Sequence, residues 1–211
     1  MRQLPSYLNR KAPAIEPGEL SDAADPYRPL IARWLLEMAL CLGWYRKLRA
    51  DRPPTIFTDE EFVAATEVEV PGDRDDDGDL VASTVRKLSD AVFAKYLKRR
   101  LAVVRKQPID ADLPLFKNVD LLGQVLGLGE VEKAVLAFLG ALNAIQLFYT
   151  AVASRCATAS SATLFKLMAS LLGRTEGEIQ AALREDAALV ASGVIKLEPD
   201  RRDLEGKFSL M

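Results

Sequence analysis

The chain contains no histidine in its 211 residues. This absence removes the side chain that most often acts as a general base at neutral pH, and it also removes the commonest metal ligand. Nucleophiles that depend on a neighbouring imidazole, such as Ser-His and Cys-His pairs, are excluded for the same reason. We therefore expect no catalytic residue and no cofactor in this chain. An enzyme built on paired carboxylates has no motif in its favour.

Cysteine is scarce as well, and a secretory leader is lacking. The two cysteines, Cys41 and Cys156, each lie in an apolar stretch, which is typical of buried thiols in a reducing compartment. The first residues contain no apolar segment of the kind that opens a signal peptide. The longest uncharged run, residues 134–154, is rich in alanine and contains Gly140, Asn143 and Gln146, so it favours a buried helical hairpin over a membrane span. A cytoplasmic location without membrane attachment is expected.

An excess of charge of one sign is also missing. The 28 basic and 30 acidic residues leave a net charge of −2, which gives no overall attraction to nucleic acid or anionic lipid. The charges are nevertheless segregated, because residues 59–79 are acidic and residues 86–106 are basic. A solvated acidic loop at 70–79 beside a basic helix face is the simplest interpretation. The basic face could instead follow a phosphate backbone or bind an acidic protein; its members are Lys95, Lys98, Arg99 and Arg100.

The acidic loop partly matches a calcium-binding loop. Asp73, Asp75, Asp77 and Asp79 stand at positions one, three, five and seven of an EF-hand pattern, with Gly78 at position six. Position twelve is Thr84, where the pattern requires a bidentate glutamate. A solvated acidic loop is the preferred interpretation, with calcium as the alternative.

Helical periodicity organises the first half of the chain. Residues 1–26 are rich in proline and predict a flexible arm. Apolar residues at helical spacing predict a helix from Pro29 to Arg49, a short helix after Thr58 and a long helix over residues 86–106. The proline-containing stretch 107–114 then predicts a domain boundary, so that residues 27–110 form a helical domain and residues 113–211 a second domain.

Three helices are predicted next. Asn118 can cap a helix that ends at Leu126, Glu130 begins another that runs to Leu142, and a third covers residues 145–156. After them, Ser160 can cap a helix that ends at Gly173, and Thr175 with Glu178 forms a capping box for one more helix.

The period of the apolar residues then changes from helical to alternating. Ile195 and Leu197, and later Phe208 and Leu210, alternate with polar residues and predict a β-hairpin. Two helices joined by a short turn and followed by a hairpin form a winged helix. The fold class we predict is mainly α: a helical N-terminal region followed by a winged-helix module.

Charge then indicates what such a module binds. The second helix of the pair carries four acidic residues and one arginine between residues 175 and 186, and the hairpin is balanced in charge. A duplex repels such a surface, so a protein partner is favoured over nucleic acid. The candidate partner-binding residues are Glu176, Glu178, Gln180, Arg184, Arg201 and Arg202.

Two stretches resemble a known family. The run from Leu115 to Glu130 is similar to the entry of the winged-helix region that precedes the motor in a group of large bacterial AAA-family ATPases, and residues 189–197 resemble the segment that leads into the wing there. The resemblance covers residues 113–211. It implies a non-catalytic region that binds a substrate or partner and is attached to an ATPase, which could also supply oligomerisation.

This chain departs from the family because it has no phosphate-binding loop; the nearest fragment is Gly206-Lys-Phe208. The chain is therefore either a piece that precedes the motor, which we expect, or a stand-alone relative of this region. The alternative is a winged-helix regulator of transcription that uses the basic helix for phosphate contacts.

Overall fold

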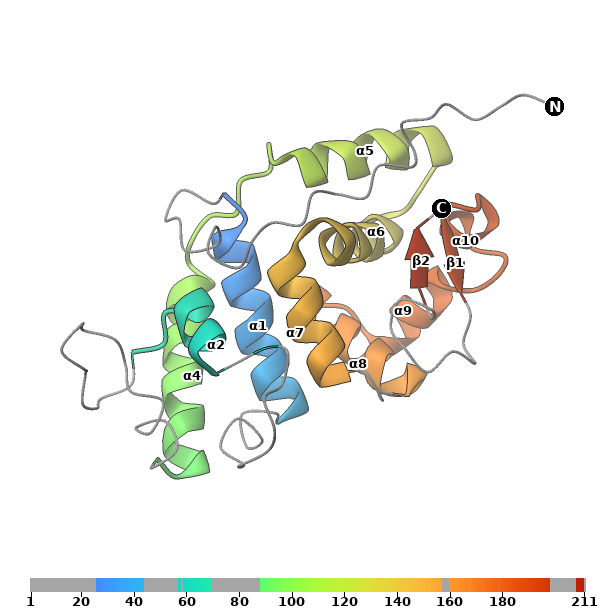
Figure 1. The fold of residues 1–211 in the computed structure, drawn as a ribbon. Helices are drawn as coiled ribbons and strands as arrows, with labels where there is room; N and C mark the ends of the chain where they lie inside the picture. Colours follow the sequence, from blue (N-terminus) through green and yellow to red (C-terminus); the bar gives the residue numbers. More distant parts are fainter. Residues whose placement is uncertain are drawn as a thin grey trace.

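The computed structural model describes residues 26–43, 57, 59–69, 88–156, 160–197 and 208–210. Within these residues the chain is mainly helical, as the sequence predicts, with nine helices and one pair of short strands (Figure 1). The helices are α1 (Arg28–Leu42), α2 (Asp59–Thr66), α4 (Asp90–Val104), α5 (Pro114–Leu126), α6 (Glu130–Ala144), α7 (Gln146–Cys156), α8 (Ser161–Leu172), α9 (Glu176–Ala182) and α10 (Ala188–Ala191). The strands are β1 (Ile195–Leu197) and β2 (Phe208–Leu210).

Helix α1 forms the centre of the hydrophobic core. It packs against α2 and α4 on one side and against α7 and α8 on the other (Figure 1). Trp34 of α1 lies 5.8 Å from Phe138 of α6 and 5.0 Å from Phe148 of α7, measured between ring centroids. The buried side chains form one continuous cluster from Leu30 to Ile195, so the core extends across the domain boundary predicted at residues 107–114. The division into two domains stays a prediction.

Two helices are shorter than predicted. Helix α1 ends at Gly43, which adopts φ of +62°, a conformation that glycine reaches without a steric penalty. The predicted continuation to Arg49 is therefore wrong, and residues 44–50 lie outside the described part. Helix α4 begins at Asp90 because the Ser89 hydroxyl accepts a hydrogen bond from the Val92 N–H at 3.3 Å.

Helix α5 begins earlier than predicted, at Pro114, and Asn118 lies inside it instead of capping it. Proline suits the first helical position, because its fixed φ fits the helix and its missing N–H leaves no donor unpaired there. The next backbone N–H, that of Leu115, donates to the hydroxyl of Tyr27 at 3.2 Å. The start of α5 is therefore attached to the residue that precedes α1.

The two predicted helices α6 and α7 are confirmed, but the hairpin predicted for residues 134–154 is not, because the chain does not reverse its direction between them. The chain bends by 98° at Ile145 between the two helices. Within the described residues no single helix is long and apolar enough to cross a membrane, whereas α6 and α7 together pass that test only as a bent pair.

The C-terminal caps are also confirmed. Ser160 caps α8 through a 3.2 Å bond from the Thr163 N–H, and Gly173 follows α8 with φ of +63°. Thr175 and Glu178 form the predicted capping box of α9. Strands β1 and β2 pair in antiparallel register, with Ile195 opposite Leu210.

A short helix, α10, which the sequence did not predict, stands between α9 and β1. It is linked to α6 through Glu132. One carboxylate oxygen of Glu132 accepts from the Gly129 N–H at 2.9 Å, and the other accepts from the Leu189 N–H at 3.1 Å. Helix α10, and not α9, is therefore the helix directly before the strand pair.

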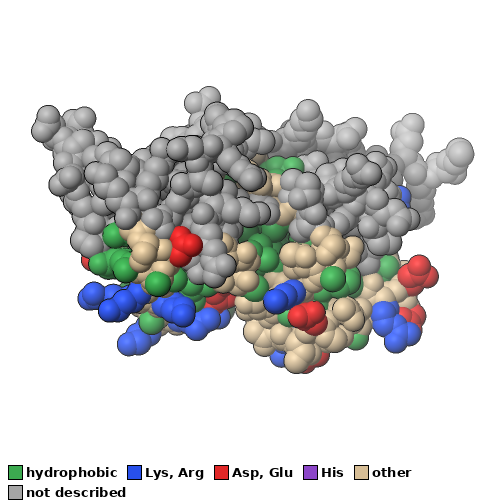
Figure 2. Space-filling model, turned by 90° about the horizontal axis from the view of Figure 1, so that it is seen from below, with side chains coloured by type: hydrophobic (Ala, Val, Ile, Leu, Met, Phe, Trp, Pro, Cys, Tyr) green, Lys and Arg blue, Asp and Glu red, His purple; other side chains and the backbone are tan. Residues whose placement is uncertain are grey.

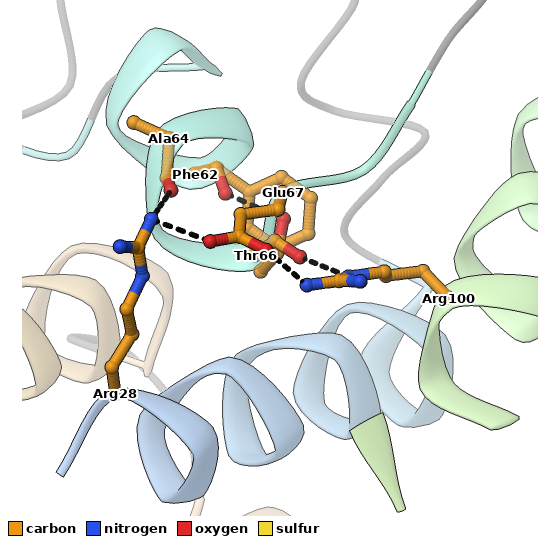
Figure 3. A network of polar contacts seen from close by, with 6 residues as sticks. All are labelled: Arg28, Phe62, Ala64, Thr66, Glu67 and Arg100. Carbon is orange, nitrogen blue, oxygen red and sulfur yellow. Dashed lines mark hydrogen bonds and ion pairs between the residues drawn. The ribbon is translucent and has the colours of Figure 1, made fainter. Parts of the chain in front are cut away.

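A second polar network joins α1, α2 and α4 (Figure 3). Glu67 follows the last turn of α2 with φ of +51°, and its carboxylate pairs with both Arg28 and Arg100. Arg100 also donates to the Thr66 carbonyl at 2.8 Å, and Arg28 donates to the Ala64 carbonyl at 3.5 Å. The two arginines thus satisfy carbonyls that the end of α2 leaves without a helical partner.

Candidate partner-binding surfaces

Helix α9 ends at Ala182, short of the predicted end at Asp186, and its two acidic residues face solvent. Glu176, Glu178 and Gln180 are exposed, whereas Ile179 and Ala182 are buried against the core. Glu178 is engaged in the capping box, and the hydrogen bonds from the backbone and side chain of Thr175 lower the pKa of its carboxyl group. The Glu178 carboxylate is therefore ionised at neutral pH, and the acidic face as a whole is accessible.

Of the three arginines predicted for this surface, the structure describes one. Arg184 is exposed, and its guanidinium pairs with Asp186 at 3.1 Å, so it adds little net charge. Arg201 and Arg202 lie outside the described residues. Helix α10 stands directly before β1 and consists of Ala-Leu-Val-Ala. The helix next to the strand pair therefore carries no charged side chain.

Helix α4 carries the predicted basic face. Lys95, Lys98 and Arg99 are exposed, and Lys106 extends the same side beyond the helix end. Figure 2 shows Lys and Arg side chains gathered at the left of the molecule, where α4 lies in Figure 1. Among them stand two exposed apolar side chains, Val92 and Val103.

Two arginines of the basic stretch form ion pairs with residues outside α4. Arg100 is bound to Glu67 and to the Thr66 carbonyl, as Figure 3 shows. Arg105 is bound to Glu37, whose side chain is only 4% exposed. These two residues therefore connect helices. Arg105 nevertheless stays more than half exposed, so within the described residues it joins Lys95, Lys98, Arg99 and Lys106 as an exposed cation.

Helix α5 carries a surface that the sequence reasoning missed. Leu121, Leu122 and Val125 are 61%, 41% and 81% exposed, the first and last being the most exposed of the large apolar side chains described. Only Val119 and Gly123 of α5 are buried. We name Leu121, Leu122 and Val125 the apolar flank of α5. Single exposed apolar residues are ordinary, but three on one helix indicate an interaction surface.

The other side of α5 is packed closely on α6. A Cβ atom at Gly123 would lie 2.6 Å from Cε of Lys133, and one at Gly140 would lie 2.8 Å from a methyl carbon of Leu115. The Lys133 amine lies 3.3 Å from Asp120 of α5, and this hydrogen bond raises the pKa of Lys133. Close packing and this ion pair hold one side of α5 against α6, so the apolar flank is presented on the other side.

A signal for the apolar flank existed in the sequence. Apolar residues of α5 recur on more than one side of the helix, because Leu115, Val119 and Leu126 form one stripe and Leu121 and Val125 another. A helix buried on one side needs only one stripe. The spacing of the apolar residues does not show which of the two stripes faces the core.

No metal centre emerges from the described residues, among which no three His, Cys, Asp or Glu side chains lie close enough to hold an ion. The calcium candidates Asp73, Asp75, Asp77 and Asp79 lie outside the described residues, so that prediction stays open.

Comparison with protein-family models, with curated proteins and with solved structures gives no match for this chain. The resemblance of residues 113–211 to the AAA-family region therefore remains an expectation from the sequence. The functional argument that follows depends on the surfaces described above.

Proposed function

We propose that this chain is a non-catalytic protein-binding region and that the apolar flank of α5 is its main binding surface. The observation that carries the proposal is the exposure of Leu121 and Val125 on a helix whose opposite side is fixed to α6. Burial of such side chains at an interface stabilises a complex, since each fully buried large aliphatic side chain contributes about 1.5–3 kcal/mol. A preformed helix also loses little conformational freedom on binding.

We further propose, on the resemblance of residues 113–211, that the region belongs to an AAA-type ATPase and that α8, α9, β1 and β2 form part of a winged helix. The antiparallel pairing of β1 with β2 supports the second part. The acidic face of α9 supports a protein partner there in preference to a duplex. The reading frame past Met211 tests the first part: a phosphate-binding loop supports it, and a stop codon directly after Met211 removes it.

Site-specific photo-crosslinking tests the binding surface. A photoreactive amino acid at position 125 should give crosslinks to protein in cells that express the chain from its own gene. The matched control carries the same amino acid at position 103, where Val103 is 48% exposed on α4. Equal or weaker crosslinking at position 125 than at position 103 contradicts the proposal.

A second candidate is a DNA-binding regulator, which the exposed Lys95, Lys98 and Arg99 favour. Phosphate contacts by these cations predict duplex binding that weakens steeply with salt. Fluorescence anisotropy with a labelled duplex over a salt series decides between the two. Absence of binding at low salt removes this candidate.

A further inference from the structure

Two residues of the apolar flank, Leu121 and Val125, belong to a longer seam along α5. Pro114, Asn118, Leu121 and Val125 are spaced by four, three and four residues, which is the spacing of the a and d positions of a coiled coil. All four residues are exposed. At 3.6 residues per turn, Asn118, Leu121 and Val125 point about 100–160° away from Val119, which faces the core. The seam is therefore turned away from α6 and is accessible to a second helix.

The residue types in the seam select the kind of partner. Leucine at d with valine at a favours a pair of parallel helices. Asn118 occupies the other a position, and an asparagine at a single a position fixes the register and the number of strands, because it hydrogen-bonds to the asparagine of an identical partner. A partner with an apolar residue at that position would leave the amide buried and unpaired.

The neighbours of the seam do not oppose a second copy. The positions that flank it are Leu115, Lys117, Leu122 and Gln124. The one charge among them is Lys117, whose amine already lies 3.1 Å from Asp112. Flanking charges normally set the choice between different partners in a coiled coil, and here no like charges face each other in a parallel pair.

From these observations we infer that α5 binds α5 of a second copy of this chain, in parallel and in register, with Asn118 opposite Asn118 of the partner copy. This inference rests on the proposed role of α5 as a binding surface and names its occupant. The seam is short, since it spans one helix of 13 residues. Such a small interface is typical of a dimer that dissociates on dilution.

Sedimentation equilibrium of the purified 211-residue chain tests the dimer. We expect a reversible monomer–dimer equilibrium in the micromolar range. Leu121→Glu and Val125→Glu should each weaken the association at least tenfold. Val103→Glu is the matched control, because it adds the same charge at an exposed valine of α4, and it should leave the equilibrium unchanged. Circular dichroism verifies that each variant keeps its helix content.

A charge exchange at position 118 tests the register. Asn118→Asp and Asn118→Lys should each be monomeric, because like charges then face each other at the centre of the pair. An equimolar mixture of the two variants, one of them fluorescently labelled, should form a heterodimer detected by anisotropy. A wild-type chain that stays monomeric at high concentration, or Asn118 variants that dimerise alone as the wild type does, overturns the inference.

These outcomes are separable from the proposed function. If the purified chain is monomeric but position 125 still crosslinks to another protein, α5 is a binding surface and the second copy is the wrong occupant. If position 125 crosslinks to no protein, the proposed function itself fails.

Discussion

The carboxylate of Glu37 in α1 accepts a hydrogen bond from Nε of Arg105, 3.1 Å away beyond the end of α4. Arg33, one turn earlier in α1, donates to the same oxygen at 3.2 Å. The other oxygen, Oε2, is buried without a hydrogen-bond partner. Two arginines thus balance a nearly buried charge, and this pairing ties α4 to the central helix.

Arg105→Met is expected to lower the free energy of unfolding by about 2–4 kcal/mol, because it removes one partner of a buried carboxylate. Glu37→Met should cost less than about 1 kcal/mol, since it removes the charge together with the cost of its burial. Urea denaturation of both single variants and of the double variant measures the coupling. Lys106→Met is the control and should be neutral. A larger cost for Glu37→Met than for Arg105→Met contradicts this account.

Arg100→Ala should destabilise the fold, whereas the same substitution at the exposed Lys95 and Lys98 of α4 should not. The variant loses the bond to the Thr66 carbonyl and the pair with Glu67, and a cost of about 1–2 kcal/mol is expected. Lys98→Ala and Lys95→Ala should change the stability by less than about 0.5 kcal/mol, because their side chains are exposed and carry no fold contact. Thermal denaturation compares the three. Equal effects of the three substitutions would show that the contacts of Arg100 with Thr66 and Glu67 do not stabilise the fold.

The capping box of α9 predicts a dependence of stability on pH. Thr175→Ala should cost about 1 kcal/mol at neutral pH. The pKa of Glu178 is lowered in the folded chain, so its contribution is present above the ordinary pKa of 4.5 and is lost as the pH falls through the folded value. Glu178→Gln should therefore remove part of the loss of stability in acid. Glu176→Gln, in the same turn but outside the box, should leave that loss nearly unchanged in denaturation curves recorded from pH 7 to pH 3.

Cys156 is expected to be unreactive in the folded chain. Burial, and after it the neighbouring Cys41, raise the pKa of its thiol from 9.0 to about 11. Between these values the unfolded chain gives up a proton that the folded chain keeps, so stability should fall by roughly 3 kcal/mol from pH 9 to pH 11 and then level off. Cys156→Ala should remove most of this decline. Rapid labelling of Cys156 at pH 8 without unfolding would contradict its burial.

Local signals were sufficient for most of the helices. Ser160 and the pair Thr175 and Glu178 mark helix starts through bonds between residues three apart in sequence, and Gly173 marks a helix end through its positive φ. The sequence alone therefore predicts α8 and the start of α9, whereas α9 ends at Ala182 and not at the predicted Asp186. Helix α5 shows the limit of this reasoning. Asn118 and Pro114 can both begin a helix, and in the structure the start at Pro114 is accompanied by a long-range acceptor for the N–H of Leu115. That acceptor is Tyr27, which lies 88 positions away in sequence.

The candidate surfaces, too, were predicted from the sequence only in part. The sequence by itself determined the helical character, the acidic composition of α9 and the basic composition of α4, because these follow from residue type and from spacing along one helix. Only the tertiary structure decided that Arg100 and Arg105 pair with Glu67 and Glu37, and that Leu121 and Val125 stay exposed. A helix with apolar residues on two sides can bury either one, and the close approach of α6 at Gly123 and Gly140 selects which side remains in water.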